Sequence, residues 1–108
     1  MAREFNTVGV VGLGTMGAGI AQLCVQAGFP TIGLEVSEER GQHGRDTIAH
    51  YLGRAVEKGR LSAEECDAAL DRLTLTTDLV DLAGCHLVIE AVVEELPTKR
   101  EVFAALDR

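Results

Sequence analysis

The sequence predicts an α/β domain in which short strands form one parallel sheet. Short apolar runs alternate along the chain with segments whose apolar residues repeat at helical spacing. A glycine-rich turn, residues 12–17, joins the first apolar run to the first helical segment. Strands and helices that alternate in this way are typical of a parallel sheet covered by helices. The 108 residues suffice for one domain of this kind.

The glycine-rich turn reads G-L-G-T-M-G and fits the pattern G-x-G-x-x-G. In that pattern the first glycine permits a tight turn, the second lets a pyrophosphate approach the backbone, and the third allows the helix to pack on the strand. The helix that follows offers unpaired N–H groups and about half a positive charge to the phosphates. We therefore predict a Rossmann-like NAD site that includes Gly12, Leu13, Gly14, Thr15, Met16 and Gly17.

The first two strands and the helix between them fit this interpretation. Residues 5–11 form a nearly continuous apolar run, as expected for a strand covered on both faces. The helix begins at residue 15 or 16 and ends at Gly28, and residues 31–35 form the second strand. Glu35 ends that strand, where a Rossmann unit places the carboxylate that accepts hydrogen bonds from the ribose. Its charge would repel a 2′-phosphate, so NAD is favoured over NADP.

The next connection, about residues 38–72, is predicted to be an inserted helical hairpin. Ser37 is a good N-cap for the first helix, and Gly59 ends it. Residues 62–65 read S-A-E-E, a capping box that starts the second helix. Gly41 and Gly44 each weaken a helix by about 1 kcal/mol relative to alanine, so the first turns should be its loosest part. A hairpin beside a dinucleotide site is a candidate lid or substrate wall.

The remaining residues predict two further strands and a last helix. Residues 73–77 are expected to form the third strand, and 79–83 a single helical turn. Residues 86–93 form the fourth strand, and Pro97 opens the last helix. A sheet order of 3-2-1-4 places the fourth strand at an edge. Glu90, inside that apolar strand, either faces the site or is a structural carboxylate with partners.

Composition excludes several classes of function. The net charge of −7 comes from residues 61–108, whereas residues 1–60 are neutral, and neither part carries a basic surface for nucleic acid. No apolar run approaches the ~20 residues of a membrane span, and we expect a cytoplasmic protein without a membrane partner. The three cysteines are odd in number and lack metal-binding spacing, so we expect buried free thiols.

Residues 12–22 (GLGTMGAGIAQ) and 87–107 (LVIEAVVEELPTKREVFAALD) closely resemble the 3-hydroxyacyl-CoA dehydrogenase family. The resemblance extends over the whole chain, the helical hairpin included. It implies oxidation of an L-3-hydroxyacyl-CoA to the 3-ketoacyl-CoA, with NAD accepting the hydride and a His–Glu pair acting as the base. An acyl-CoA is therefore the expected substrate.

The resemblance also implies roles for individual residues. Glu35 stands where the family usually has aspartate on the ribose, and Glu94 and Lys99 match residues that line the NAD site. Lys58 matches a lysine that contacts the CoA moiety, whereas Tyr51 replaces a small polar CoA contact. The predicted cofactor site is completed at the end of the fourth strand by Ala91 and Val92.

The family continues past the region matched here with a fifth strand, the catalytic His and its Glu partner, and a helical C-terminal domain. We therefore expect residues 1–108 to be a partial NAD-binding domain that lacks the catalytic strand and is inactive alone. Its homo-oligomers would form through the exposed strand 87–93 or the last helix. The alternatives are a stand-alone nucleotide-binding or interaction module that does no chemistry, and a hydroxyisobutyrate-type dehydrogenase, which would explain the hairpin less well.

Overall fold

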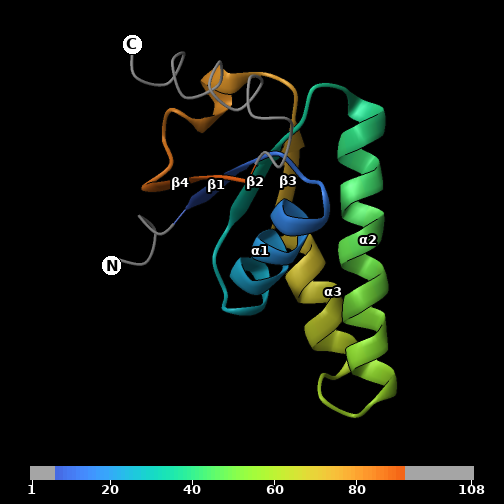
Figure 1. Cartoon of the computed structure of the whole chain (residues 1–108). Helices are drawn as coiled ribbons and strands as arrows, with labels where there is room; N and C mark the ends of the chain where they lie inside the picture. Colours follow the sequence, from blue (N-terminus) through green and yellow to red (C-terminus); the bar gives the residue numbers. More distant parts are fainter. Residues whose placement is uncertain (1–6, 92–108) are drawn as a thin grey trace.

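The computed structural model describes residues 7–91, which form a four-stranded parallel sheet with helices packed on it (Figure 1). The strands lie in the order β3-β2-β1-β4. This order confirms the predicted Rossmann-like sheet. Their bounds are β1 Val8–Val11, β2 Thr31–Leu34, β3 Leu73–Thr76 and β4 Leu87–Glu90.

Three α-helices and one short 3-10 helix connect the strands (Figure 1). They are α1 Thr15–Gln26, α2 Glu38–Glu57, α3 Ala63–Asp71 and the 3-10 helix η2 Leu79–Leu82. Helices α2 and α3 contact each other and form the inserted hairpin. The predicted ends of the first and fourth strands (residues 5–6 and 92–93) and the helix predicted to open at Pro97 lie outside the described residues.

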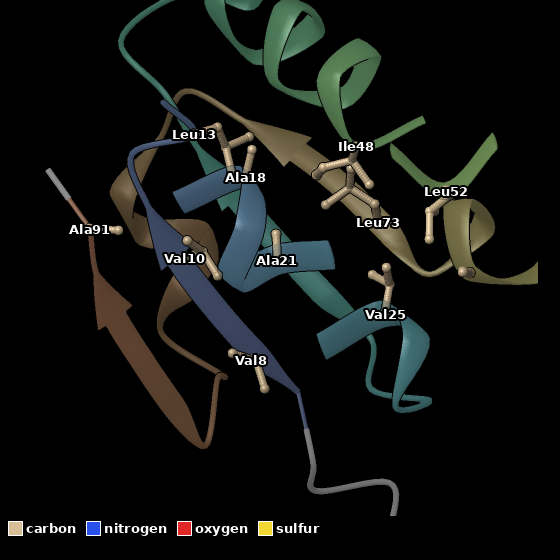
Figure 2. Packing of buried hydrophobic residues seen from close by; sticks show 11 residues of the cluster. Val8, Val10, Leu13, Ala18, Ala21, Val25, Ile48, Leu52, Leu73 and Ala91 are labelled. Carbon is tan, nitrogen blue, oxygen red and sulfur yellow. The ribbon is translucent and has the colours of Figure 1, made fainter. Parts of the chain in front are cut away.

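One face of the sheet is covered by α1, α2 and α3. Val8 and Val10 of β1 point to this face, because side chains alternate between the two faces along a strand. They join a cluster of buried side chains to which α1, α2, α3 and β3 also contribute (Figure 2). Ile48 and Leu52 of α2 are fully buried in it, which explains their i, i+4 spacing in the sequence.

The opposite face carries η2 and the turn that follows it. Gly9 points to this face, and a Cβ built there would lie 3.0 Å from the Leu82 side chain and 3.1 Å from the Sγ atom of Cys85. Leu82 is buried, whereas Leu79 and Val80 of the same short helix are exposed. Strand β4 forms the sheet edge, and its Leu87 and Val88 are 55% and 41% exposed.

Side-chain caps fix the starts of three helical segments. Ser37 accepts a hydrogen bond from the Arg40 N–H at the start of α2, and Asp78 caps η2 in the same way. At α3 the predicted capping box is present, with Ser62 and Glu65 each accepting the other's backbone N–H. Helix α1 differs, since its N-cap is Gly14 and no side chain caps it.

One glycine in the first turns of α2, Gly44, has a packing role that the sequence did not indicate. Both Gly41 and Gly44 are buried. A Cβ at Gly44 would lie 2.6 Å from the Cβ of Leu13, so only glycine lets α2 approach the glycine-rich turn this closely. Within residues 7–91, none of the helices combines the length and the apolar character that crossing a membrane requires.

Candidate dinucleotide site

The glycine-rich turn leaves β1 and enters α1 as predicted. Gly12 has a positive φ of 92°, which favours glycine, and its N–H donates to the Leu34 carbonyl at 2.8 Å. At Gly17 a Cβ would lie 1.7 Å from the Gly12 carbonyl oxygen, a distance that no side chain can occupy. Gly12 and Gly17 therefore lie in direct contact, which only glycine at position 17 permits.

Gly14 has a different environment, because a Cβ built there would meet no atom within 4 Å. Its backbone is extended, and it directly precedes α1. The first turn of α1 contains no acidic residue, whereas α2, α3 and η2 all carry acids there. The start of this helix therefore has neither a side-chain cap nor an acidic residue in its own first turn, which suits an anion-binding helix N-terminus.

Leu13 fixes the turn from inside the protein. Its side chain is only 2% exposed and fills the space that side chains at Gly33 of β2 and Gly44 of α2 would occupy. Figure 2 shows this side chain close to the start of α1. Leu13 was predicted as a cofactor-site residue, and its buried side chain limits it to a backbone contribution.

Glu35 follows β2 and points at the glycine-rich turn. Its Oε2 atom accepts the Leu13 N–H at 2.8 Å, and its Oε1 atom accepts its neighbour Val36 N–H at 3.0 Å. The Glu35 N–H donates to the Thr76 carbonyl of β3, which fixes the backbone as well. An ionised carboxylate offers about four acceptor positions, so two remain for ribose hydroxyl groups.

A cleft of about 440 Å³ opens beside this carboxylate. Its size lies in the range of about 300–1,000 Å³ typical of small-molecule sites. It is lined by two residues of the glycine-rich turn, by Glu35 and by the first two turns of α2: Leu13, Gly14, Glu35, Glu39, Arg40 and His43. The sequence indicated the first three of these residues but not the last three.

The signal for the missed residues was present in the spacing. Arg40 and His43 are three residues apart on a helix, so they share one face. Because α2 starts at Glu38, only three residues after Glu35, that face begins close to the predicted ribose acid. What the sequence did not give was the direction in which α2 leaves the sheet, which depends on the packing of Gly44 on Leu13.

The other predicted cofactor residues are placed as follows. Thr15 and Met16 are exposed in the first turn of α1. Ala91 is buried, its N–H donates to the Val11 carbonyl at 2.8 Å, and its Cβ lies beside Gly17. Three further predicted residues, Val92, Glu94 and Lys99, lie outside the described residues.

The predicted CoA contact lies far from this cleft. Lys58 is exposed at the C-terminal cap of α2, and the 20 residues of that helix span ~30 Å from the cleft end. Tyr51, 48% exposed, lies two turns earlier on the same face as Lys58. Among the described residues, the structure thus places the predicted CoA contact at the far end of α2 from Glu35 and the glycine-rich turn.

Glu90 of β4 is partly buried. It lies in register with Val11, so both side chains point to the face of the sheet that carries η2. Its two carboxylate oxygens are buried, and within residues 7–91 neither has a hydrogen-bond partner. The structure therefore does not support the interpretation of Glu90 as a structural carboxylate satisfied by these residues.

The three cysteines are free thiols, but they are partly buried and not fully buried as predicted. Burial raises the pKa of the Cys24 and Cys85 thiols above the ordinary value, which disfavours the reactive thiolate. Across the described part of the chain, no group of three or more His, Cys, Asp and Glu residues is arranged to hold a metal ion.

Comparisons with known proteins agree with this geometry. Residues 7–108 match the family model described as the NAD-binding domain of 3-hydroxyacyl-CoA dehydrogenase. The chain is 47% identical over 108 residues to a 3-hydroxybutyryl-CoA dehydrogenase of Mycobacterium tuberculosis, covering 100% of this chain and 38% of that protein. It is 42% identical over 106 residues to a 3-hydroxyadipyl-CoA dehydrogenase of Escherichia coli, covering 98% of this chain and 22% of that protein.

Solved structures of 3-hydroxybutyryl-CoA dehydrogenases are also similar to this chain. The crystal structure of an (S)-3-hydroxybutyryl-CoA dehydrogenase from Ralstonia eutropha is similar with a TM-score of 0.89 at 36% identity. That match covers 95% of this chain and 36% of the other. The chain thus spans well under half the length of the relatives that it matches. On the family match, the sheet order and the glycine-rich turn together, the chain belongs to the 3-hydroxyacyl-CoA dehydrogenase family and represents its NAD-binding domain.

Proposed function

We propose that this chain is the NAD-binding portion of an oxidoreductase that oxidises an L-3-hydroxyacyl-CoA to the 3-ketoacyl-CoA by hydride transfer to NAD. The observation that carries the proposal is the start of α1. Gly14 is open to an approaching group, the helix start has no cap and no acid, and Glu35 is fixed beside it. The pyrophosphate would rest on the α1 N–H groups, and Glu35 would accept the ribose hydroxyls.

The role of the turn is tested by NAD titration calorimetry on the variant Gly14→Ala. The added methyl group meets no protein atom within 4 Å, so the melting temperature should stay at the wild-type value. The same methyl group would occupy the space through which the pyrophosphate approaches the backbone. We expect NAD affinity to fall at least about tenfold, as expected when one charge-assisted contact is lost.

Gly19→Ala is the matched control. Gly19 lies in the same helix, and its Cβ also meets nothing within 4 Å, but it is a turn away from the helix start. NAD affinity should stay at the wild-type value in this variant. Equal affinities in the Gly14→Ala variant and the wild type would contradict a pyrophosphate at this turn.

For the substrate side, we propose that Lys58 contacts the CoA moiety of an acyl-CoA. Exposed Arg54 lies one turn before Lys58, so α2 presents two cations with Tyr51 on one face. Such a face suits the phosphates and adenine of CoA. Lys58→Gln should weaken CoA binding several-fold in calorimetry, whereas Arg45→Gln, near the other end of α2, should not.

The catalytic His–Glu pair implied by the family resemblance is not assigned to any residue of this chain. We therefore propose that the chain alone binds NAD but forms no NADH from 3-hydroxybutyryl-CoA. Sustained NADH formation, followed by absorbance, would overturn this. A module that never does chemistry and a hydroxyisobutyrate-type dehydrogenase are less well supported, since the relatives named above are hydroxyacyl-CoA dehydrogenases.

Two further proposals concern self-association and cellular location. We propose self-association through β4, because Leu87 and Val88 expose apolar side chains on an edge strand. We also propose a cytoplasmic location, which three unpaired cysteines favour because disulfides are rare in reducing compartments.

A further inference from the structure

The cleft beside Glu35 combines one fixed anion with a cation that has no partner. Glu35 is held by the Leu13 and Val36 N–H groups. Arg40 lines the same cleft, and among residues 7–91 no acid pairs with its guanidinium. An arginine that lines a site without a carboxylate partner is available to a phosphate, which it binds in a bidentate manner.

His43 lies on the same side of the cleft, one turn further along α2. Its imidazole can donate a hydrogen bond, so Arg40 and His43 together offer donors to a second phosphate. Glu39 also lines the cleft, and it is the remaining charged group there. With Glu35 and Glu39 ionised and Arg40 charged, the acids outnumber the cation, and a 2′-phosphate is disfavoured.

We propose that Arg40 and His43 form a latent phosphate site that sets the cofactor preference of this cleft, with the charges of Glu35 and Glu39 keeping a 2′-phosphorylated dinucleotide out. The proposal rests on the proposed NAD site. It goes further by assigning specificity to two residues of α2 that the glycine-rich motif does not include. Replacing the charge at position 35 then uncovers NADP binding without any new residue.

The test is calorimetric titration of NAD and NADP into wild type and Glu35→Gln. Glutamine removes the charge and keeps one oxygen that can accept the Leu13 N–H, while its NH2 group replaces the oxygen that accepts the Val36 N–H. We expect NADP affinity to rise about tenfold in Glu35→Gln, because a phosphate gains charge-assisted hydrogen bonds of ordinary strength. Adding Arg40→Gln to that variant should remove the gain, and adding His43→Gln should remove part of it.

Arg60→Gln, added to Glu35→Gln, is the matched control. It removes the same charge from the exposed turn between α2 and α3, away from the cleft, and should leave the NADP gain intact. If Glu35→Gln does not fold, Glu39→Gln gives the second measurement. Its side chain holds no backbone group, and its NADP affinity should rise several-fold while NAD affinity is kept.

The outcomes separate the two proposals. If wild type binds neither dinucleotide, the proposed NAD site is wrong and the latent phosphate site falls with it. If wild type binds NAD but the neutral variants gain no NADP affinity, or if the gain survives Arg40→Gln, only the latent site is wrong.

Discussion

The two faces of the sheet differ in how completely they are covered. On one face, α1, α2 and α3 bury Val8, Val10 and their neighbours in a continuous cluster (Figure 2). On the other face, η2 buries Leu82 over Gly9 but leaves Leu79 and Val80 exposed. The candidate NAD cleft lies between the glycine-rich turn and α2, and both pack on the fully covered face. The residues that stabilise the fold therefore also position the cleft. Substitutions on the two faces should therefore have unequal effects.

The largest difference is expected between two glycines of opposite faces. At Gly17 a Cβ would lie 1.7 Å from a backbone oxygen, whereas at Gly9 it would lie 3.0 Å from the movable Leu82 side chain. Gly17→Ala should lose about 4 kcal/mol or more of unfolding free energy, and Gly9→Ala about 1 kcal/mol. Urea unfolding measures both. Equal losses would mean that the closed turn is less constrained than its geometry indicates.

Truncating one leucine on each face should sharpen the comparison. Leu52 is fully buried in the cluster to which three helices contribute, and Leu82, at the end of the 3-10 helix η2, is 5% exposed. Leu52→Ala should cost about 3–4 kcal/mol, and Leu82→Ala about 2 kcal/mol, since the less covered site can collapse around the cavity. A larger loss in Leu82→Ala than in Leu52→Ala would reverse the assignment of the main core.

The helix caps give a smaller effect with a defined pH dependence. Ser62→Ala should cost about 1 kcal/mol at neutral pH. Hydrogen bonds from the Ser62 backbone and side chain lower the pKa of Glu65 below its ordinary value. Its contribution is therefore complete above its unfolded-state pKa and is lost as the pH falls through the lower folded-state pKa. The unfolding free energies of wild type and Glu65→Ala should thus converge in acid, and a difference that stays constant down to low pH would contradict this.

The smallest effect on stability is expected at the sheet edge. Val88→Lys places a charge on the exposed edge strand and should change the unfolding free energy by no more than about 0.5 kcal/mol. If the chain associates through β4, the variant should shift the sedimentation profile towards the monomer. Leu23→Lys, exposed on α1, is the matched control and should leave association unchanged. If Val88→Lys and Leu23→Lys give the same sedimentation profile, the contact between copies does not involve β4.

Much of the described fold could be predicted from the sequence, because its signals are local. The apolar runs predicted the four strands, and Ser37 and Ser62 marked helix starts that the structure confirms. The glycine spacing and Glu35 identified the position of the cleft, since both follow strands of a parallel sheet.

The parts that could not be predicted depend on contacts between distant residues. The hydrogen bond from the Leu13 N–H to Glu35 joins positions 22 residues apart and depends on a side-chain rotamer. The same is true of Gly44, which in the sequence looks like a weak point of a helix and in the structure is the place where α2 rests on Leu13. Arg40 and His43 reach the cleft only because of that contact.

Leu13 is fixed both by its buried side chain and by its backbone N–H, and this affects the energetics of ligand binding. Its side chain is enclosed between β2 and α2, and its amide is held by a carboxylate, so this part of the turn is ordered before any ligand arrives. A flexible loop gives up conformational entropy when it closes on a ligand, and that loss subtracts from affinity. Here that entropy was already lost during folding, so ordering this part of the turn does not reduce the affinity for a ligand.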